Sequence, residues 1–251
     1  MAIYVTSDAH GHVRALDEAL SKISLASEDT LYVLGDMIDR GPDPVGVIKL
    51  VRSLPNARVL KGNHEQIMLD AIIGQDPLDA ETWDINGGWT TREQLNDMEF
   101  EAYEELVRWM AGLPLYAVAE TDERPYLLGH AGIETEAARA FLLEHDVDCA
   151  DGAGAVGADP ELLKQMLAVQ SSDDLLWIRH GYWDAPTGLL SAEGKGPVVV
   201  SGHTPTVSLG RYCEVGGLAG LDEESGRGQI VRLGGEDTAG VPDRIDIDCA
   251  A

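Results

Sequence analysis

The sequence is poor in basic residues. Lysine and arginine together number 18, against 44 aspartates and glutamates, which gives a formal net charge of −26. A protein that grips the phosphate backbone of a nucleic acid normally presents a basic stripe. The deficit therefore argues against a nucleic-acid partner. A small phosphoryl group can still bind where metal ions and a few arginines make a site locally positive.

Cysteines and long apolar runs are also scarce. The three cysteines are far apart and show no CxxC spacing, so neither a disulfide framework nor a thiolate zinc site is indicated. No stretch approaches the roughly 18 apolar residues of a membrane span, and no basic region followed by an apolar one opens the chain. We therefore expect a cytoplasmic protein with no membrane partner, folded as a single domain over residues 1–251. The sequence leaves its oligomeric state open.

The first third of the chain alternates short apolar strands with helices. Strands are expected at residues 3–7, 31–34 and 57–60, and helices at residues 12–23, at residues 43–54, and after residues 62–65 as far as residue 73. This β-α-β-α-β series predicts parallel pairing with right-handed crossovers. The carboxyl ends of the strands then meet at one edge of the sheet, where polar residues follow each strand.

The densest stretch is LYVLGDMIDRG, residues 31–41, which joins a strand, a glycine turn, two carboxylates and an arginine. Asp36 is central in the strand series, and a carboxylate in that position is a candidate to hold two metal ions about 3.5 to 4 Å apart. Because the three strand ends meet at one edge of the sheet, we expect Asp8, His10, Asp36, Asn63 and His64 to converge there.

Four of the seven histidines follow directly after a predicted strand, beside a glycine: His10, His64, His130 and His203. Packing alone rarely produces such a pattern, whereas the other three histidines are interpreted as structural. Together with Asp8, Asp36 and Asn63, these histidines offer oxygen and nitrogen ligands without sulfur, a set suited to Mn²⁺, Fe²⁺ or Zn²⁺.

The rest of the chain is less regular. Residues 77–96 are poorly periodic and are predicted as a surface loop anchored by Trp83 and Trp89. Helical and loop insertions are expected at about 77–112 and 134–172. We expect a helix at 99–111, strands at 115–119 and 126–128, a helix at 135–145, a loop at 148–158, a helix at 159–169, and strands at 197–200, 230–233 and 244–248. The second sheet then either has an unprotected edge or takes its closing strand from residues 230–233.

Five segments carry a family resemblance. DAHG, GDMIDRG, GNHE, HAG and GHT occur in that order between Asp8 and Thr204, and they resemble the calcineurin-like metallophosphoesterases, more narrowly the phosphoprotein phosphatase branch. NGGW at 86–89 and LLWIR at 175–179 resemble the small bacterial and phage serine/threonine phosphatases. The resemblance implies an α/β fold, a four-layer α/β/β/α sandwich of two mixed sheets flanked by helices.

The same resemblance implies a dimetal site, with two divalent ions that we expect to be Mn²⁺, or else Fe or Zn. One ion is implied on Asp8, His10 and Asp36, and the other on Asp36, Asn63, His130 and His203. Arg40 and Arg179, with Asn63, are then expected to bind the substrate phosphate. His64 is implied as the general acid, and Asp39 as the residue that orients it.

The activity expected from this set is metal-dependent phosphomonoester hydrolysis. We expect a serine/threonine protein phosphatase that acts on a phosphoprotein or phosphopeptide, by direct attack of a hydroxide that bridges the two metals. The alternative is a symmetrical dinucleoside tetraphosphate hydrolase, the activity of a sister branch. That branch typically lacks an aspartate at the position of Asp39 and has aspartate at the position of Glu65, so the two residues favour the phosphatase.

Two further alternatives are weaker. The acidic composition and the GDxxDRG pattern disfavour a nuclease-type phosphodiesterase. The presence of every expected ligand and of His64 disfavours a catalytically silent module that binds phosphoproteins.

Overall fold

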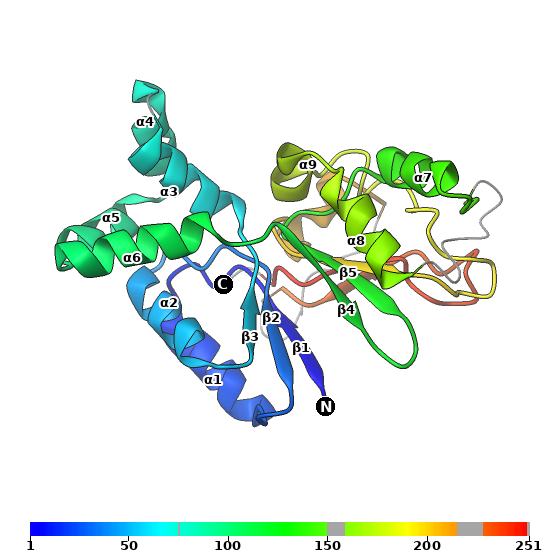
Figure 1. The fold of residues 1–251 in the computed structure, drawn as a ribbon, viewed down its shortest axis with the longest axis horizontal. Helices are drawn as coiled ribbons and strands as arrows, with labels where there is room; N and C mark the ends of the chain where they lie inside the picture. Colours follow the sequence, from blue (N-terminus) through cyan, green and yellow to red (C-terminus); the bar gives the residue numbers. More distant parts are fainter. Residues whose placement is uncertain (75, 150–158, 215–227, 250–251) are drawn as a thin grey trace. The chain divides into compact units, whose positions relative to one another are not determined.

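The computed structural model describes residues 1–74, 76–149, 159–214 and 228–249 (Figure 1). The chain forms two compact units, Met1–Pro114 and Leu115–Ala250, here called the N-terminal and the C-terminal unit. Each unit has its own sheet, its own helices and its own hydrophobic core. The expected α/β architecture of two sheets flanked by helices is confirmed.

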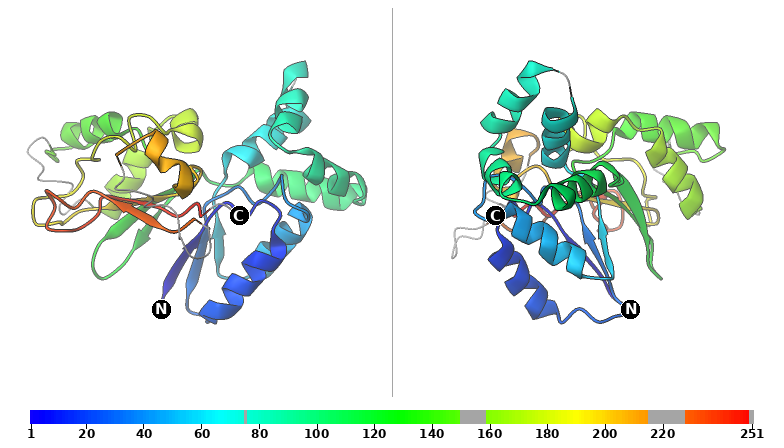
Figure 2. Two further views of the ribbon diagram at one scale, coloured as in Figure 1. Left: turned by 180° about the vertical axis from the view of Figure 1, so that it is seen from behind. Right: turned by 60° about the vertical axis from the view of Figure 1, so that its left-hand side comes forward.

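The sheet of the N-terminal unit has the order β1-β2-β3, and both strand pairs are parallel. Its strands are β1 (Ile3–Thr6), β2 (Thr30–Val33) and β3 (Ala57–Val59), and the crossover helices are α1 (Val13–Ile23) and α2 (Pro44–Ser53). The two helices lie side by side along this sheet (Figure 1, Figure 2). The predicted β-α-β-α-β series is therefore confirmed, but this sheet is parallel throughout its described strands and not mixed.

The start of helix α2 is fixed by its capping residues. The Asp43 carboxylate caps the helix by accepting a hydrogen bond of 2.9 Å from the backbone N–H of Gly46, and Pro44 occupies the first helical position. From there Val47, Ile48 and Val51 pack into the core of the unit. The segment between β2 and α2 is thus fixed at both ends, which holds the polar residues between them in place.

Four helices follow β3, namely α3 (Asn63–Ile73), α4 (Pro77–Ile85), α5 (Trp89–Asn96) and α6 (Phe100–Ala111). The prediction of a surface loop at 77–96 is wrong, because α4 and α5 fill that range. Asp76 caps α4 by accepting from the N–H of Leu78 at 2.9 Å, with Pro77 next to it. This start signal was present in the sequence, but the helices are short and bury few apolar side chains, so the helical period was hidden.

The sheet of the C-terminal unit is mixed and has the order β4-β5-β6-β8-β7. Its strands are β4 (Tyr116–Glu120), β5 (Pro125–Gly129), β6 (Val198–Ser201), β7 (Val231–Leu233) and β8 (Arg244–Asp246). Strand β6 lies parallel to both β5 and β8, whereas β4 and β7 are antiparallel to their neighbours. The last described strand, β8, is therefore internal, and β7 pairs with its outer side. This agrees with the expectation that residues 230–233 supply the closing strand.

The helices of this unit are α7 (Thr135–Glu144), α8 (Pro160–Ala168) and α9 (Ser172–Trp177), and a 3₁₀ helix, η1, covers Thr206–Arg211. Helix α8 packs against β4 (Figure 1). Most of the loop expected at 148–158, residues 150–158, lies outside the described residues. The core of the unit includes Leu127, Val199 and Trp183.

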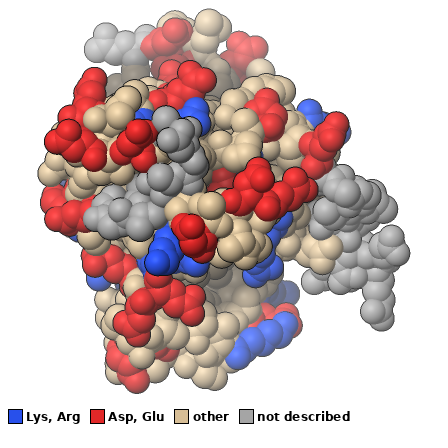
Figure 3. Space-filling model, turned by 90° about the vertical axis from the view of Figure 1, so that its right-hand side faces the viewer, with Lys and Arg blue, Asp and Glu red and all other residues tan. Residues whose placement is uncertain are grey.

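Figure 3 shows one face of the molecule, on which acidic side chains are spread widely and basic ones occur in a few places. This agrees with the net charge of −26. Among the helices of the described residues, none has the length and apolar character needed to cross a membrane.

Gly35 is the glycine on which the turn after β2 depends. Its φ is +93°, and a Cβ built there would lie 2.3 Å from the backbone nitrogen of Gly62. Replacing Gly35 by alanine is therefore expected to lower the free energy of unfolding by about 3 kcal/mol or more, because the strained backbone and the clash add. Urea unfolding of the metal-free protein measures this change.

Gly112 supplies the matched control for that experiment. It has a φ of −83°, and a Cβ there would meet only carbonyl oxygens at 3.6 Å. Gly112→Ala should leave stability unchanged or raise it slightly. Equal stability of the two variants would show that the turn tolerates a side chain at position 35.

Candidate active site

Backbone hydrogen bonds join the turns that follow β1 and β2. The N–H of Asp8 donates to the carbonyl of Gly35 at 3.2 Å, and the N–H of His10 donates to the carbonyl of Asp36 at 2.9 Å. One residue further on, the N–H of Gly11 donates to the Met37 carbonyl at 2.9 Å. The side chains of Asp8, His10 and Asp36 are therefore held close together by the main chain itself.

The buried carboxylate of Glu65 ties the third strand end to this pair. It accepts three backbone hydrogen bonds of 2.8 Å, from the N–H groups of Asp36, Met37 and Gly62. In addition, the N–H of His64 donates to Asp36 Oδ1 at 3.0 Å. Glu65 thus fixes the Asp36 turn against the start of α3.

We expect Glu65→Gln to lower the free energy of unfolding by about 3 kcal/mol, because a neutral amide replaces a carboxylate and points a donor at buried N–H groups. Thermal or urea unfolding of the metal-free protein measures the loss. Glu101→Gln, at an exposed position on α6, is the control and should change stability little. A Glu65→Gln variant as stable as the control would contradict the bracing role.

The imidazoles of His10 and His64 are held as neutral tautomers. His10 Nδ1 donates to the carbonyl of Ile38 at 2.9 Å, and His64 Nδ1 donates to Asp39 Oδ2 at 2.7 Å. The Arg40 guanidinium lies 2.9 Å from His10 Nε2 and 2.8 Å from His64 Nε2. Because arginine can only donate, both Nε2 atoms accept, and neither ring carries a second proton. Burial first, and then the charge of Arg40, lowers the pKa of His10 to about 3.

Asp39 sits in a buried cluster of hydrogen-bond donors. Its carboxylate accepts from the Thr91 hydroxyl at 2.6 Å and from Trp83 Nε1 at 3.1 Å, as well as from His64. Burial raises the pKa of Asp39 to about 6, although the hydrogen bonds from Thr91 and Trp83 and the charge of Arg40 oppose this. Sequence reasoning missed both donors, since it assigned their segment to a loop.

The donor set around Asp36 fits a divalent cation. His10 Nε2 lies 3.6 Å and His64 Nε2 lies 3.9 Å from Asp36 Oδ2, and one ligand atom from each of the three residues lies within 4.8 Å of the others. Burial, followed by the negative charges of Asp8 and Glu65, raises the pKa of Asp36 well above its usual value. Buried like charges beside neutral imidazoles are stabilised by a cation. Asn63, also buried, begins α3 in the same unit.

Backbone strain is concentrated at the candidate residues. Nine non-glycine residues in the described part of the chain have a positive φ, and six of them belong to the predicted site. These six are Asp8, His10, Asp36, Asp39, Arg40 and His203. Such conformations are costly and persist where the surrounding structure enforces them, so their clustering supports a functional site here.

The C-terminal unit contributes a second group. His130 follows β5 and His203 follows β6; both are buried, and their ring centroids are 5.0 Å apart. The N–H of Gly202 donates to the His130 carbonyl at 2.8 Å, which links the two turns. Arg179 Nη2 donates to the His203 carbonyl at 3.4 Å. Of the predicted site residues, these three therefore lie together in this unit, and the other seven lie in the N-terminal unit.

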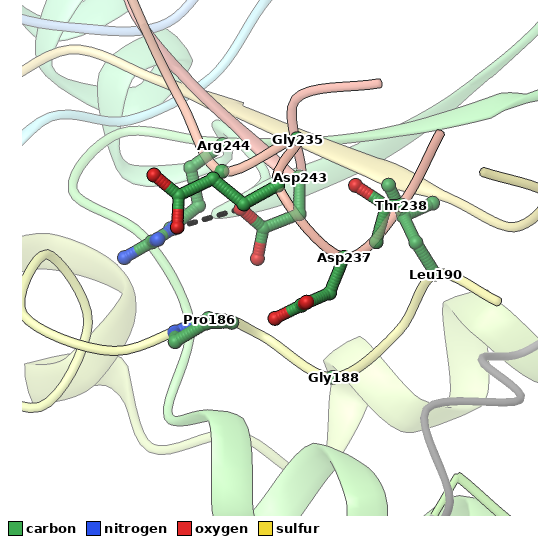
Figure 4. A pocket seen from close by; sticks show the side chains of 10 residues that line it. Pro186, Gly188, Leu190, Gly235, Asp237, Thr238, Asp243 and Arg244 are labelled. Carbon is green, nitrogen blue, oxygen red and sulfur yellow. Dashed lines mark hydrogen bonds and ion pairs between the residues drawn. The ribbon is translucent and has the colours of Figure 1, made fainter. Parts of the chain in front are cut away.

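A pocket of about 390 Å³ in the C-terminal unit is a poor phosphate site (Figure 4). Arg244 lines this pocket, but its guanidinium is buried and donates to Asp243 and to the carbonyls of Tyr182 and Trp183. Two carboxylates, of Glu236 and Asp237, also line the pocket. A polyanion would be repelled there.

The comparisons with known proteins are consistent with the site. The family model described as calcineurin-like phosphoesterase matches residues 1–226. A relative from Proteus mirabilis (strain HI4320), named symmetrical bis(5'-nucleosyl)-tetraphosphatase, is 33% identical over 219 residues, which are 85% of this chain and 68% of that protein. A relative of the same name from Pectobacterium atrosepticum is 31% identical over 221 residues, 86% of this chain and 68% of that protein.

A solved structure supports the fold. A crystal structure provisionally assigned as a diadenosine tetraphosphatase is similar with a TM-score of 0.51 and 18% identity, over 99% of this chain and 83% of that one. At this identity the likeness concerns the fold alone.

The expected phosphoprotein or phosphopeptide substrate is wrong, because the curated relatives are enzymes of small nucleotides. The error came from using Asp39 and Glu65 to choose between the two branches. Glu65 accepts three backbone N–H groups, and Asp39 binds His64, Trp83 and Thr91. Both residues are thus engaged in supporting the site, and neither position reports on the rest of the substrate.

Proposed function

Because this chain belongs to the calcineurin-like phosphoesterase family, we propose that it is a metal-dependent hydrolase that cleaves dinucleoside tetraphosphates symmetrically into two nucleoside diphosphates. The proposed substrate is based on the similarity of about five-sixths of the chain to relatives named symmetrical bis(5'-nucleosyl)-tetraphosphatase, at 30 to 33% identity. The buried ligand set around Asp36 supports the metal dependence.

We propose that Asp8, His10 and Asp36 hold one divalent ion, and that Asp36, Asn63, His130 and His203 hold a second, with Mn²⁺ as the metal. When bound, such ions neutralise phosphate charge and lower the pKa of water. His10 and His64 are neutral, and each Nε2 accepts from Arg40 in the structure, so a metal ion or a proton would bind at Nε2 by replacing that guanidinium. The hydrogen bond from His10 Nδ1 to a backbone carbonyl fixes which nitrogen is offered.

The phosphate is bound, in this proposal, by Arg40, Asn63 and Arg179. A planar guanidinium pairs with two phosphate oxygens at once, which suits a polyphosphate better than a point charge does. Arg40 lies beside the proposed ligands, because its guanidinium donates to His10 Nε2 and to His64 Nε2, and phosphate oxygens would replace these two acceptors.

His64 is the proposed general acid, and Asp39 is its positioning residue. The Nδ1–H of His64 is held at 2.7 Å by the Asp39 carboxylate, which fixes the ring and favours a proton on Nε2 during the reaction. Trp83 and Thr91 hold Asp39 in turn. These contacts fix the His64 ring through Nδ1, so Nε2 is the nitrogen that would carry the proton to the leaving group.

The test is hydrolysis of diadenosine tetraphosphate by chelator-treated protein, with and without added Mn²⁺, and with products separated by chromatography. We expect metal-dependent release of ADP as the only nucleotide product. Parallel assays with Fe²⁺, Zn²⁺ and Mg²⁺ identify the metal that restores the highest turnover.

Two results would overturn the proposal. Release of AMP and ATP would show asymmetric cleavage, and the absence of any nucleotide release with full metal occupancy would show that another substrate is used. Turnover that is unchanged by chelation would refute the metal dependence.

A further inference from the structure

An exposed tryptophan stands beside one of the candidate ligand histidines. Trp177 is the last residue of α9, and its side chain is 40% exposed, whereas its neighbours Leu175 and Leu176 are buried. Helix α9 therefore anchors itself with two leucines and presents the third apolar side chain to solvent. An exposed aromatic face of this kind can stack on a ligand, and burial of the face would then contribute to the free energy of binding.

Trp177 is fixed relative to the histidines of its unit. Its ring meets the His203 ring edge-on, with 5.8 Å between centroids and 89° between planes. The N–H of Ala131, next to His130, donates to the carbonyl of Leu175 at 3.0 Å. The exposed indole is thus held close to both histidine-bearing turns.

A further aromatic ring lies against the nearby Arg179, and another ring lies against the first. The guanidinium carbon of Arg179 lies 5.9 Å from the centroid of the Tyr212 ring, and the rings of Tyr212 and His180 are 5.1 Å apart. His180 is exposed and Tyr212 is half-buried. Tyr212 therefore lies beside the proposed phosphate ligand Arg179, with His180 next to it. Trp177 lies beside His203, whose carbonyl accepts from Arg179.

This combination suits one class of ligand, a phosphate attached to a flat aromatic group. Aromatic side chains bind nucleobases by stacking, which tolerates any base because every base has a π face. Arginine binds the phosphate that follows. Inorganic polyphosphate would use the arginine and leave the rings uncovered.

We propose that Trp177, aided by Tyr212 and His180, forms a nucleobase-stacking subsite for one nucleoside end of the substrate. This inference rests on the proposed function, because it assigns the part of a dinucleoside polyphosphate that lies beyond the phosphates. Trp177 is then a specificity residue, and purine ends bind better than pyrimidine ends because they stack over a larger area.

The test compares the binding of ADP and of inorganic pyrophosphate to the Mn²⁺-loaded full chain by calorimetry. Trp177→Ala is expected to weaken ADP binding about tenfold, a typical loss for one stacked base, and to change pyrophosphate binding by less than about twofold. Trp177→Phe, which keeps an aromatic face, should retain most of the affinity. Trp177→Leu, which keeps an apolar cover over His203, should lose as much as alanine does.

Trp109 on α6, which is half-buried beneath the Arg52 guanidinium, is the control, and Trp109→Ala should leave both affinities unchanged. Equal loss of ADP and pyrophosphate binding in Trp177→Leu would overturn the inference, because it would show that Trp177 only holds His203. Equal affinities for ADP in the phenylalanine and leucine variants would do the same. If the wild type fails to cleave diadenosine tetraphosphate but shows the ADP pattern, the subsite stands and the proposed function falls.

Discussion

Replacing Asp36 by asparagine is expected to lower kcat/KM for diadenosine tetraphosphate by at least about 10³-fold, because the amide is neutral and cannot neutralise two cations. The fold should survive the change. The amide oxygen can still accept the N–H of His64, and the neutral group relieves repulsion from Asp8 and Glu65. Steady-state kinetics measures the fall in kcat/KM, and metal analysis after gel filtration measures the accompanying loss of bound metal.

The stability of the metal-free protein separates this expectation from simple unfolding. Metal-free Asp36→Asn should unfold at a urea midpoint at least as high as that of the wild type, while it binds fewer divalent ions. Asp122→Asn, in an exposed turn, is the matched control and should keep both activity and metal content. Retention of two tightly bound ions by Asp36→Asn would remove Asp36 from its proposed bridging position.

The second large effect is expected at His64 and depends on the leaving group. A general acid contributes about 10² to 10⁴ in rate when the leaving group is a poor one. An alkoxide is the conjugate base of an alcohol, an acid about as weak as water, whereas the terminal phosphate of a nucleoside diphosphate has a pKa of about 6. His64→Asn should therefore lower turnover on alkyl phosphates by at least about 100-fold, and turnover on diadenosine tetraphosphate far less.

A series of aryl phosphates with graded leaving groups measures this effect directly. The dependence of log kcat on leaving-group pKa should be steeper in His64→Asn than in the wild type. Asparagine can still donate to Asp39 from about the position of Nδ1, so the local packing and the metal content should persist. His12→Asn, in the same unit, is the control. Parallel lines for the wild type and the His64 variant would exclude His64 as the proton donor.

Much of the N-terminal unit was predictable because its signals are local. An apolar run followed by a glycine or a polar turn gives the strand ends, and the right-handed crossover rule brings those ends together. Asp8, His10, Asp36 and His64 could therefore be grouped before the structure was known. The supporting residues could not, because Trp83 and Thr91 contact Asp39 across 44 and 52 residues of sequence.

The substrate was harder to predict than the reaction. The five sequence segments contain the proposed metal ligands and the proposed proton donor, a set that the resemblance assigns to the family as a whole. Glu65 and Asp39 seemed to discriminate between branches, but their contacts are to the backbone and to His64. A residue proposed to bind the nucleobase, such as Trp177, belongs to no motif of fixed spacing in the sequence. It becomes visible only in the structure, as an exposed ring beside His203.

The acidic surface has a kinetic consequence. With a net charge of −26, the protein repels a polyanion before contact, and the attraction of the site acts only at short range. The association rate should then rise with ionic strength toward 0.15 M, where the Debye length shrinks to about 8 Å, the opposite of the behaviour of nucleic-acid-binding proteins. Substrate that arrives as a magnesium complex carries less charge and is repelled less. The concentration of free Mg²⁺ in the medium would therefore influence the association rate.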